Sequence, residues 1–273
     1  MQASPVWTAP TGTLGRIVAE ARERAAALQS REAELAAAAR QTPDPPGFAQ
    51  ALRGATVRVI AEVKRRSPSK GWINPGITAA EQARAYARGG AAAISVLTEP
   101  AHFGGSNEDL VAVRAAVNVP LLKKDFHVHP VQLAEARALG ASAALLIVRA
   151  LAPDELIRMT DAARRLQLEA LVEVRDEDEL QRALDAGATI VGINNRNLET
   201  LVIDPSTAER LLPLVPESIV AIAESGVSSR ADVERLAAHG ADAVLVGSSV
   251  SAAEDPSSAV ASLCGVERAS RDR

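Results

Sequence analysis

The chain has 273 residues and a mass of 28.5 kDa, with 30 Lys and Arg against 34 Asp and Glu, which gives a formal charge of −4. An apolar fraction of 47% excludes a disordered chain, the acidic balance argues against nonspecific nucleic-acid binding, and no apolar run approaches the roughly 20 residues of a membrane helix. The single cysteine, Cys264, excludes an intrachain disulfide and a multi-cysteine zinc site, and no secretory signal is visible, so we expect a cytoplasmic globular protein.

The N-terminal segment predicts helices ahead of the first strand. Between Thr11 and about Arg40, apolar residues recur at helical spacing, which indicates one amphipathic helix. Residues 41–46, QTPDPP, form a proline-rich break, and a short helix is expected over about Gly47–Arg53. The apolar positions of the first helix are Leu14, Ile17, Val18, Ala21, Ala25 and Leu28.

Eight apolar, often β-branched runs follow, and alanine-rich helical stretches separate them. Their starts lie 20 to 36 residues apart, which suits one strand, one helix and two loops in each interval. Glycines that precede the next strand, at Gly90, Gly140, Gly187 and Gly240, are typical of left-handed helix caps. The runs are Val57–Val63, Ala93–Leu97, Val119–Leu122, Ala143–Val148, Glu169–Val174, Thr189–Ile193, Ile219–Ala223 and Ala243–Val246.

This alternation predicts an α/β protein built from right-handed βαβ units around a parallel sheet that is buried on both faces. Eight units favour a closed (β/α)8 barrel, a TIM barrel, with an N-terminal helical extension. A doubly wound open sheet is the alternative, but it usually has about five or six strands, and no G-x-G-x-x-G follows the first run. We expect an extension over residues 1–54, one barrel domain over 55–264 and a charged tail over 265–273.

Polar residues stand where several of the strands end, which is the end that carries the chemistry in such barrels. In V-I-A-E-V-K, Glu62 and Lys64 are two residues apart and face the same side. A charge inside an apolar strand lowers the stability of the fold unless it is paired, so packing does not explain several such charges at one end of the barrel. Their convergence therefore predicts a catalytic site. A structural ion-pair network at the barrel mouth is the alternative. The other strand-end residues are Lys124, Glu173, Asn194, Arg196, Glu224 and Ser225.

Two glycine–serine pairs predict a phosphate site. Ser225-Gly226 and Gly247-Ser248 follow the seventh and eighth runs, where backbone N–H groups of such barrels bind phosphate. The stretch 65–71, RRSPSKG, adds positive charge and hydroxyl donors after the first run. For one pair alone, an ordinary loop with a helix cap is the favoured interpretation, and the basic stretch alone is also typical of a surface patch or a phosphorylation site. Both pairs together with the basic stretch favour phosphate.

Other candidates are weaker. His127 and His129 have a spacing that suits a metal in a strand, but no carboxylate pattern completes a zinc set, so we expect histidines in a loop or facing solvent. His102 and His239 are isolated in the sequence. No histidine lies near Ser225, so a serine triad is unsupported.

Together these residues resemble the indole-3-glycerol phosphate synthase family, whose members are phosphate-binding (β/α)8 enzymes of tryptophan biosynthesis. The resemblance implies ring closure of 1-(2-carboxyphenylamino)-1-deoxyribulose 5-phosphate to indole-3-glycerol phosphate, CO2 and water, with no cofactor and no metal. It spans nearly the whole barrel in family order. The segments that carry it are IAEVKRRSPSKG (60–71), SVLTEP…FGGS (95–106), LLKKDF (121–126), ALLIV (144–148), LVEV (171–174), GINNRNLETL (192–201), IAESGV (222–227) and VLVGSS (244–249).

The resemblance also implies roles for individual residues. Lys124 and Lys64 lie near the reacting carbonyl and carboxylate, and one or both act as general acid. Glu173 is the acid or base of the dehydration. Glu62, Asn194 and Glu224 orient these groups. Arg196 anchors or pairs with the acidic residues, and Ser225 lies near the substrate. The phosphate ligands are Lys64, Ser67, Gly226, Gly247 and Ser248, and the apolar wall around the anthranilate ring is Phe103 and Phe126. The N-terminal helix resembles the extension that helps to cover the substrate in this family.

Two further interpretations compete with this one. Another phosphate-sugar barrel, such as a phosphoribosyl isomerase, shares the phosphate loops but uses a Cys–Asp or paired Asp set, which is not found at these strand ends. A non-catalytic barrel that binds a phosphorylated ligand is opposed by the joint presence of the strand-end lysines and glutamates. The expected partner is a small phosphorylated molecule, not nucleic acid or membrane, and the expected assembly is a monomer or a weak homodimer.

Overall fold

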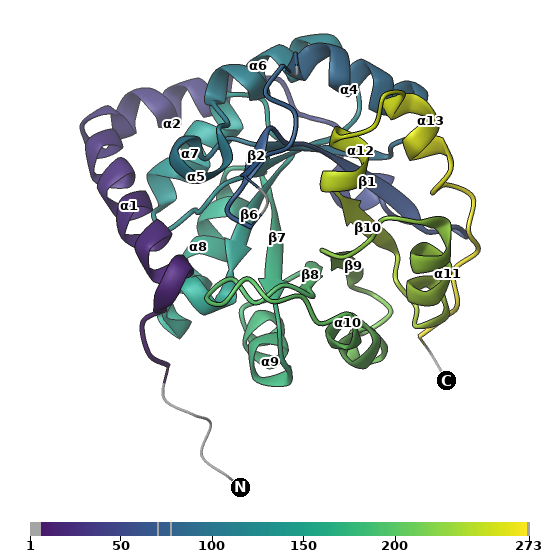
Figure 1. Ribbon diagram of the computed structural model, residues 1–273. Coiled ribbons are helices and arrows are strands. Elements are labelled where there is room, and N and C mark those ends of the chain that lie inside the picture. Colours follow the sequence, from purple (N-terminus) through teal and green to yellow (C-terminus); the bar gives the residue numbers. More distant parts are fainter. Residues whose placement is uncertain (1–6, 70, 77, 272–273) are drawn as a thin grey trace, which may run out of the picture.

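The computed structural model describes residues 7–69, 71–76 and 78–271, and its eight long strands close into a parallel barrel in the order β1-β10-β9-β8-β7-β6-β5-β4. Helices surround the strands (Figure 1). The predicted TIM barrel is therefore confirmed. The barrel strands are β1 (Arg58–Val63), β4 (Ala93–Leu97), β5 (Leu121–Lys124), β6 (Ala143–Ile147), β7 (Glu169–Val174), β8 (Ile190–Asn194), β9 (Val220–Glu224) and β10 (Ala243–Val246).

The strand predictions hold because each strand is buried on both faces. Alternate residues of a strand point into the barrel or out toward the helices, so Ile60 and Leu122 pack inside while Val59 and Leu121 pack under the outer layer. Three predicted runs match the observed strands at both ends, and the other five differ by no more than two residues at either end.

The helices that follow the strands form the outer layer, and none in the described part of the chain combines the length and apolarity required to cross a membrane. The expected glycine caps are confirmed by left-handed φ angles at Gly90, Gly140, Gly187 and Gly240. The helices are α4 (Ala79–Arg88), α5 (Pro100–Phe103), α6 (Asn107–Ala116), α7 (Pro130–Ala138), α8 (Pro153–Arg165), α9 (Glu177–Asp185), α10 (Ser206–Leu211), α11 (Arg230–Ala238), α12 (Ser248–Ser251) and α13 (Pro256–Ala261).

The N-terminal extension differs from the single long helix that the periodicity predicts. It comprises α1 (Gly12–Leu28), a 3-10 turn (Gln29–Arg31) and α2 (Glu32–Gln41), and the short helix α3 (Phe48–Ala51) follows. A straight helix of that length would run about 45 Å in one direction. The turn instead redirects the chain, so that α2 packs along α7 through the apolar cluster that joins Leu35 to Val131 and Ala134 (Figure 1).

Two local features add to the sequence predictions. A hairpin of β2 (Arg66–Ser67) and β3 (Gly71–Trp72) follows β1, and its two-residue strands are too short to leave a periodic signal. The expected charged tail packs on the barrel as far as Arg271, whose buried guanidinium donates to Asp242 at 2.8 Å.

Candidate active site

A cavity of about 530 Å³ opens at the carboxyl ends of the barrel strands. All the residues predicted for the site line it, although they come from seven of the eight strands and the loops that follow them. Lys70, part of the basic stretch after β1, lies outside the described residues. The predicted residues in the lining are Glu62, Lys64, Ser67, Phe103, Lys124, Phe126, Glu173, Asn194, Arg196, Glu224, Ser225, Gly226, Gly247 and Ser248.

Lys124, at the end of β5, is the central cation of this cavity. Its Nζ lies 3.2 Å from Oε2 of Glu224 and 3.7 Å from Oε2 of Glu173, and all three side chains are largely buried. Burial alone would lower the pKa of Lys124, but the carboxylates of Glu224, Glu173 and Glu62 outweigh it and raise the pKa above its usual value. Lys124 is therefore held as an ammonium ion that can donate a hydrogen bond or a proton.

Glu62 and Lys64 form a further ion pair, with Lys64 Nζ 3.4 Å from Glu62 Oε1. The hydroxyl of Ser95 donates to the other oxygen of Glu62 at 3.2 Å, which fixes the carboxylate from the neighbouring strand. Ser95 was not predicted for the site, and its only signal is a polar residue inside the apolar run of β4. Three lysine–glutamate ion pairs are thus present, as the ion-pair network interpretation expects, and they hold both lysines at the cavity wall.

Arg196 contacts neutral groups and not the carboxylates with which it was expected to pair. Its guanidinium donates to Ser69 Oγ at 3.2 Å and to the carbonyl of Leu201 at 3.0 Å. Among the described residues no ion pair links Arg196 to a carboxylate, so the prediction that it pairs with acidic residues is wrong. The lysines hold those carboxylates instead. Arg196 instead joins the loop after β8 to the loop after β1, across the cavity mouth.

Glu224 is positioned by a glycine on the adjacent strand. A Cβ atom on Gly192, in the middle of β8, would lie 2.2 Å from Glu224 Oε1, so only glycine leaves room for this carboxylate. Burial raises the pKa of Glu224 above its ordinary value, although Lys124 opposes that shift. Gly192 was not predicted for the site, but a glycine inside an apolar strand run is the signal that marks it.

We expect Gly192→Ala to lower kcat by roughly ten- to a hundredfold, because a displacement of catalytic groups by about an ångström costs that much. Steady-state kinetics of the purified variant would measure it, and circular dichroism would verify the fold. Gly76→Ala is the matched control, since a Cβ there meets nothing closer than 3.8 Å. A Gly192→Ala variant with the wild-type kcat would contradict this positioning role.

The glycine–serine pairs lie together on one side of the cavity. Ser225 and Gly226 both adopt left-handed φ angles, at 63° and 83°. Gly247 directly precedes α12, whose first N–H groups have no acceptor within the helix. Ser67 and Ser249 also line the cavity here. This side therefore offers hydroxyl and backbone donors with Lys64 nearby, which suits a phosphate group.

Another part of the cavity wall is apolar. The rings of Phe103 and Phe126 lie 6.2 Å apart, and Lys64 Nζ lies 5.7 Å from the Phe103 ring centre. Leu14 and Ile17 of α1 extend this wall, so the N-terminal helix covers part of the cavity. The cavity therefore has one side for an anion and one for an aromatic ring.

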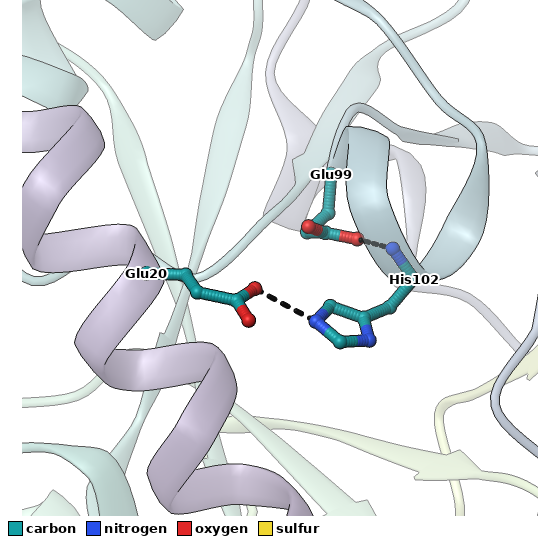
Figure 2. Close-up of side chains that lie close together, drawn as sticks. All are labelled: Glu20, Glu99 and His102. Carbon is teal, nitrogen blue, oxygen red and sulfur yellow. Dashed lines mark hydrogen bonds and ion pairs between the residues drawn. The ribbon is translucent and has the colours of Figure 1, made fainter.

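Figure 2 shows a cluster of Glu20, Glu99 and His102 between α1 and α5. His102 Nε2 lies 2.7 Å from Glu20 Oε2, so His102 is not isolated in space. The three groups are close enough to share one metal ion, but both oxygens of Glu99 already accept backbone N–H groups at the start of α5. The cluster therefore links α1 to the segment that carries Phe103.

Arg24 strengthens the same link. Its guanidinium contacts Asp125 at 3.1 Å and Glu99 at 3.7 Å, and Asp125 accepts the backbone N–H of Phe126 at 2.8 Å. Asp125 directly follows Lys124 in the chain. One residue of α1 thus holds the loops after β4 and β5.

We expect Arg24→Ala to lower kcat/KM by roughly tenfold, because both aromatic wall residues lose a fixed support. Arg22→Ala is the control, since Arg22 also lies on α1 but contacts Glu155 of α8 at 3.8 Å, away from these loops. Kinetics and thermal unfolding of both variants would be measured. Equal losses of kcat/KM in the two variants would show that the contact of Arg24 is not specific.

His127 was expected in a loop or facing solvent, and the structure places it in a loop but buried. Its Nδ1 lies 2.8 Å from the carbonyl oxygen of Leu145. Burial, with Lys123 adding repulsion, lowers the pKa of His127 to about 4, so the ring is neutral at neutral pH. His129 instead caps α7, accepting the backbone N–H of Val131. Both histidines are therefore explained by the local structure.

The fold and the cavity define a (β/α)8-barrel enzyme with acid–base groups at one side of its site and anion donors at another. The family model for indole-3-glycerol phosphate synthase matches residues 14–263, so the chain belongs to that family. Proteins named indole-3-glycerol phosphate synthase include one from Nocardioides sp. that is 54% identical over 86% of this chain and 90% of its own length. One from Kineococcus radiotolerans is 56% identical over 76% of each chain. A thiamine phosphate pyrophosphorylase structure from Pyrococcus furiosus matches with a TM-score of 0.57 and 19% identity over 76% of this chain and 93% of its own, which shows the shared fold alone.

Proposed function

We propose that the cavity closes the indole ring of 1-(2-carboxyphenylamino)-1-deoxyribulose 5-phosphate, giving indole-3-glycerol phosphate, CO2 and water. The observation that carries the proposal is the buried Lys124 ammonium between Glu173 and Glu224, in a cavity with an anion side and an aromatic side. Family membership supports the same reaction. The substrate has a phosphate, an aromatic ring and a carbonyl between them, and the cavity offers a surface for each.

Lys124 and Lys64 supply the positive charge that the ring closure needs. As the aromatic carbon attacks the ketone, negative charge develops on the carbonyl oxygen, and a lysine ammonium stabilises and protonates it. Lys64 lies against the Phe103 ring, where it can hold the carboxylate of the anthranilate group. Loss of that carboxylate as CO2 is favoured beside the apolar wall, because the charged form is poorly solvated there.

Dehydration then needs an acid for the departing hydroxyl and a base for a ring proton. Glu173 is the candidate for this step, since its carboxylate forms an ion pair with Lys124 at 3.7 Å, across which a proton can pass through one water or after a small approach. Asn194 lies at the end of the adjacent strand and lines the same cavity. We assign Glu62, Asn194 and Glu224 to orienting the lysines and the substrate, and Ser225 to the substrate's surroundings.

The phosphate is assigned to the side of the cavity formed by Ser67, Gly226, Gly247 and Ser248, with Lys64 nearby. Phe103 and Phe126 are assigned to the anthranilate ring and Arg196 to the mouth of the cavity. No second function is favoured, because Asp125 is held by Arg24 and Thr98 and so is not one of a free Asp pair.

The proposal is tested by adding the carboxyphenylamino-deoxyribulose phosphate to the purified protein and following the fluorescence of the indole product. Turnover by the wild-type chain is the expected result. Binding without turnover would point to a non-catalytic barrel, and neither binding nor turnover would favour a different phosphorylated substrate.

A further inference from the structure

The proposed reaction takes up one proton in each turnover. The carboxylate of the substrate carries a negative charge, but it leaves as neutral CO2, and the departing hydroxyl leaves as neutral water. Atoms and charge balance only if one proton enters from solvent, with the phosphate unchanged. Lys124 and Glu173 line the main cavity, which the bound substrate fills, so a proton delivered during turnover needs a second route.

A second, smaller cavity of about 160 Å³ offers such a route. It shares Glu173, Asn194 and Arg196 with the main cavity and continues along the end of β7 to the start of α9. A liquid water occupies about 30 Å³, so this space accommodates several waters. Its outer lining includes Arg149 and Glu199, whose side chains are 29% and 25% exposed, so the cavity reaches solvent.

Glu179 is the buried titratable group of this second cavity, and the mechanism above does not use it. It lies in the first turn of α9, and its Oε2 accepts the backbone N–H of Arg175 at 2.8 Å. Burial, together with the charges of Asp176 and Glu173, raises the pKa of Glu179 to about 7, while the Arg175 N–H and Arg182 oppose that rise. Near neutral pH this carboxyl can therefore both accept and release a proton.

Polar and charged groups that can hydrogen-bond to water surround Glu179 in this cavity. Arg149 and Glu199 pair at 3.0 Å and face the same cavity, with Arg175 and Asp176. The buried Nε atom of Arg175 has no acceptor in the described part of the chain, and buried donors need one, which solvent in a cavity of this size can supply. Polar groups thus line the path from the surface to Glu173.

We propose that Glu179 relays the proton consumed in each turnover from solvent to Glu173, from which it reaches Lys124. The inference rests on the proposed function. At each transfer an O–H or N–H bond breaks on the donor and forms on the acceptor, and nothing is oxidised or reduced. In this relay, water in the small cavity bridges the two carboxyl groups, which both line it, and one further water or a small approach joins Glu173 to Lys124, its ion-pair partner at 3.7 Å.

The test compares Glu179→Gln with Glu155→Gln. Both side chains accept a backbone N–H at a helix start, Glu155 from Ala152 at 2.8 Å, and glutamine retains that acceptor while losing the proton site. Steady-state kcat and KM would be measured from about pH 6 to about pH 9, at low and high imidazole concentration, with thermal unfolding as the check on folding.

At about pH 9 and low imidazole, Glu179→Gln is expected to lose roughly tenfold in kcat with KM unchanged, to lose less near pH 6, and to recover as imidazole supplies the proton. Glu155→Gln should follow the wild type throughout. The relay is overturned by a Glu179→Gln kcat within about twofold of wild type at about pH 9, or by a loss that imidazole does not restore. Absence of turnover in the wild type would instead sink the proposed function.

Discussion

Replacing Lys124 with methionine is expected to lower kcat by roughly a thousandfold, the largest effect of any single change in the cavity. Methionine keeps most of the volume but removes the ammonium that stabilises and protonates the carbonyl oxygen. It also leaves Glu173 and Glu224 without the cation that lies 3.2 to 3.7 Å from them. The rate of indole fluorescence under saturating substrate measures the effect.

Lys124→Arg separates charge from proton donation in the same position. Arginine keeps the cation but stays protonated throughout the accessible pH range, so it cannot act as a general acid. We expect this variant to bind substrate while turning over far more slowly than wild type. A Lys124→Met variant that retains more than about a tenth of the wild-type kcat would remove Lys124 from the chemistry.

Glu173→Gln is expected to lower kcat by roughly a hundredfold or more, with a much smaller change in KM. The amide has the shape of the carboxylate, but it can neither take the ring proton nor exchange a proton with Lys124. Single-turnover and steady-state rates would show whether the loss lies in the dehydration, because an intermediate that has already lost CO2 should then accumulate.

Glu169→Gln is the matched control for Glu173→Gln. Both glutamates lie on β7, at opposite ends of the strand, and Glu169 accepts backbone N–H groups of Phe48 and Ala49 at the far end of the barrel. We expect Glu169→Gln to change stability and to leave kcat nearly unchanged. Equal kinetic losses in the two variants would mean that Glu173 acts through the strand and not through its carboxylate.

The sequence predicted the barrel well because its signals are local. A strand buried on both faces needs a continuous apolar run, and a helix that returns to the sheet ends at a glycine such as Gly140 or Gly187. A charge inside such a run, as at Glu62 or Glu173, marks the strand end that faces the cavity. Short elements were predicted less well, because the two-residue strands of the β2–β3 hairpin leave no periodic pattern. The apolar stripe of the N-terminal segment continues through the turn at Gln29–Arg31 and so did not reveal it.

The eight βα units, the fold class and the residues gathered at the barrel mouth could all be predicted from local sequence, since each depends on neighbours a few positions away. Which of those residues touch became visible only in the folded chain. Lys124 meets Glu224 from a strand a hundred residues further along the chain, and Gly192 makes room for that carboxylate. The tertiary structure also placed Arg24 on Asp125 and opened the cavity beside Glu179. Such contacts depend on the closure of the barrel and the path of α1 over it, because no local pattern records a distance between segments so far apart in the chain.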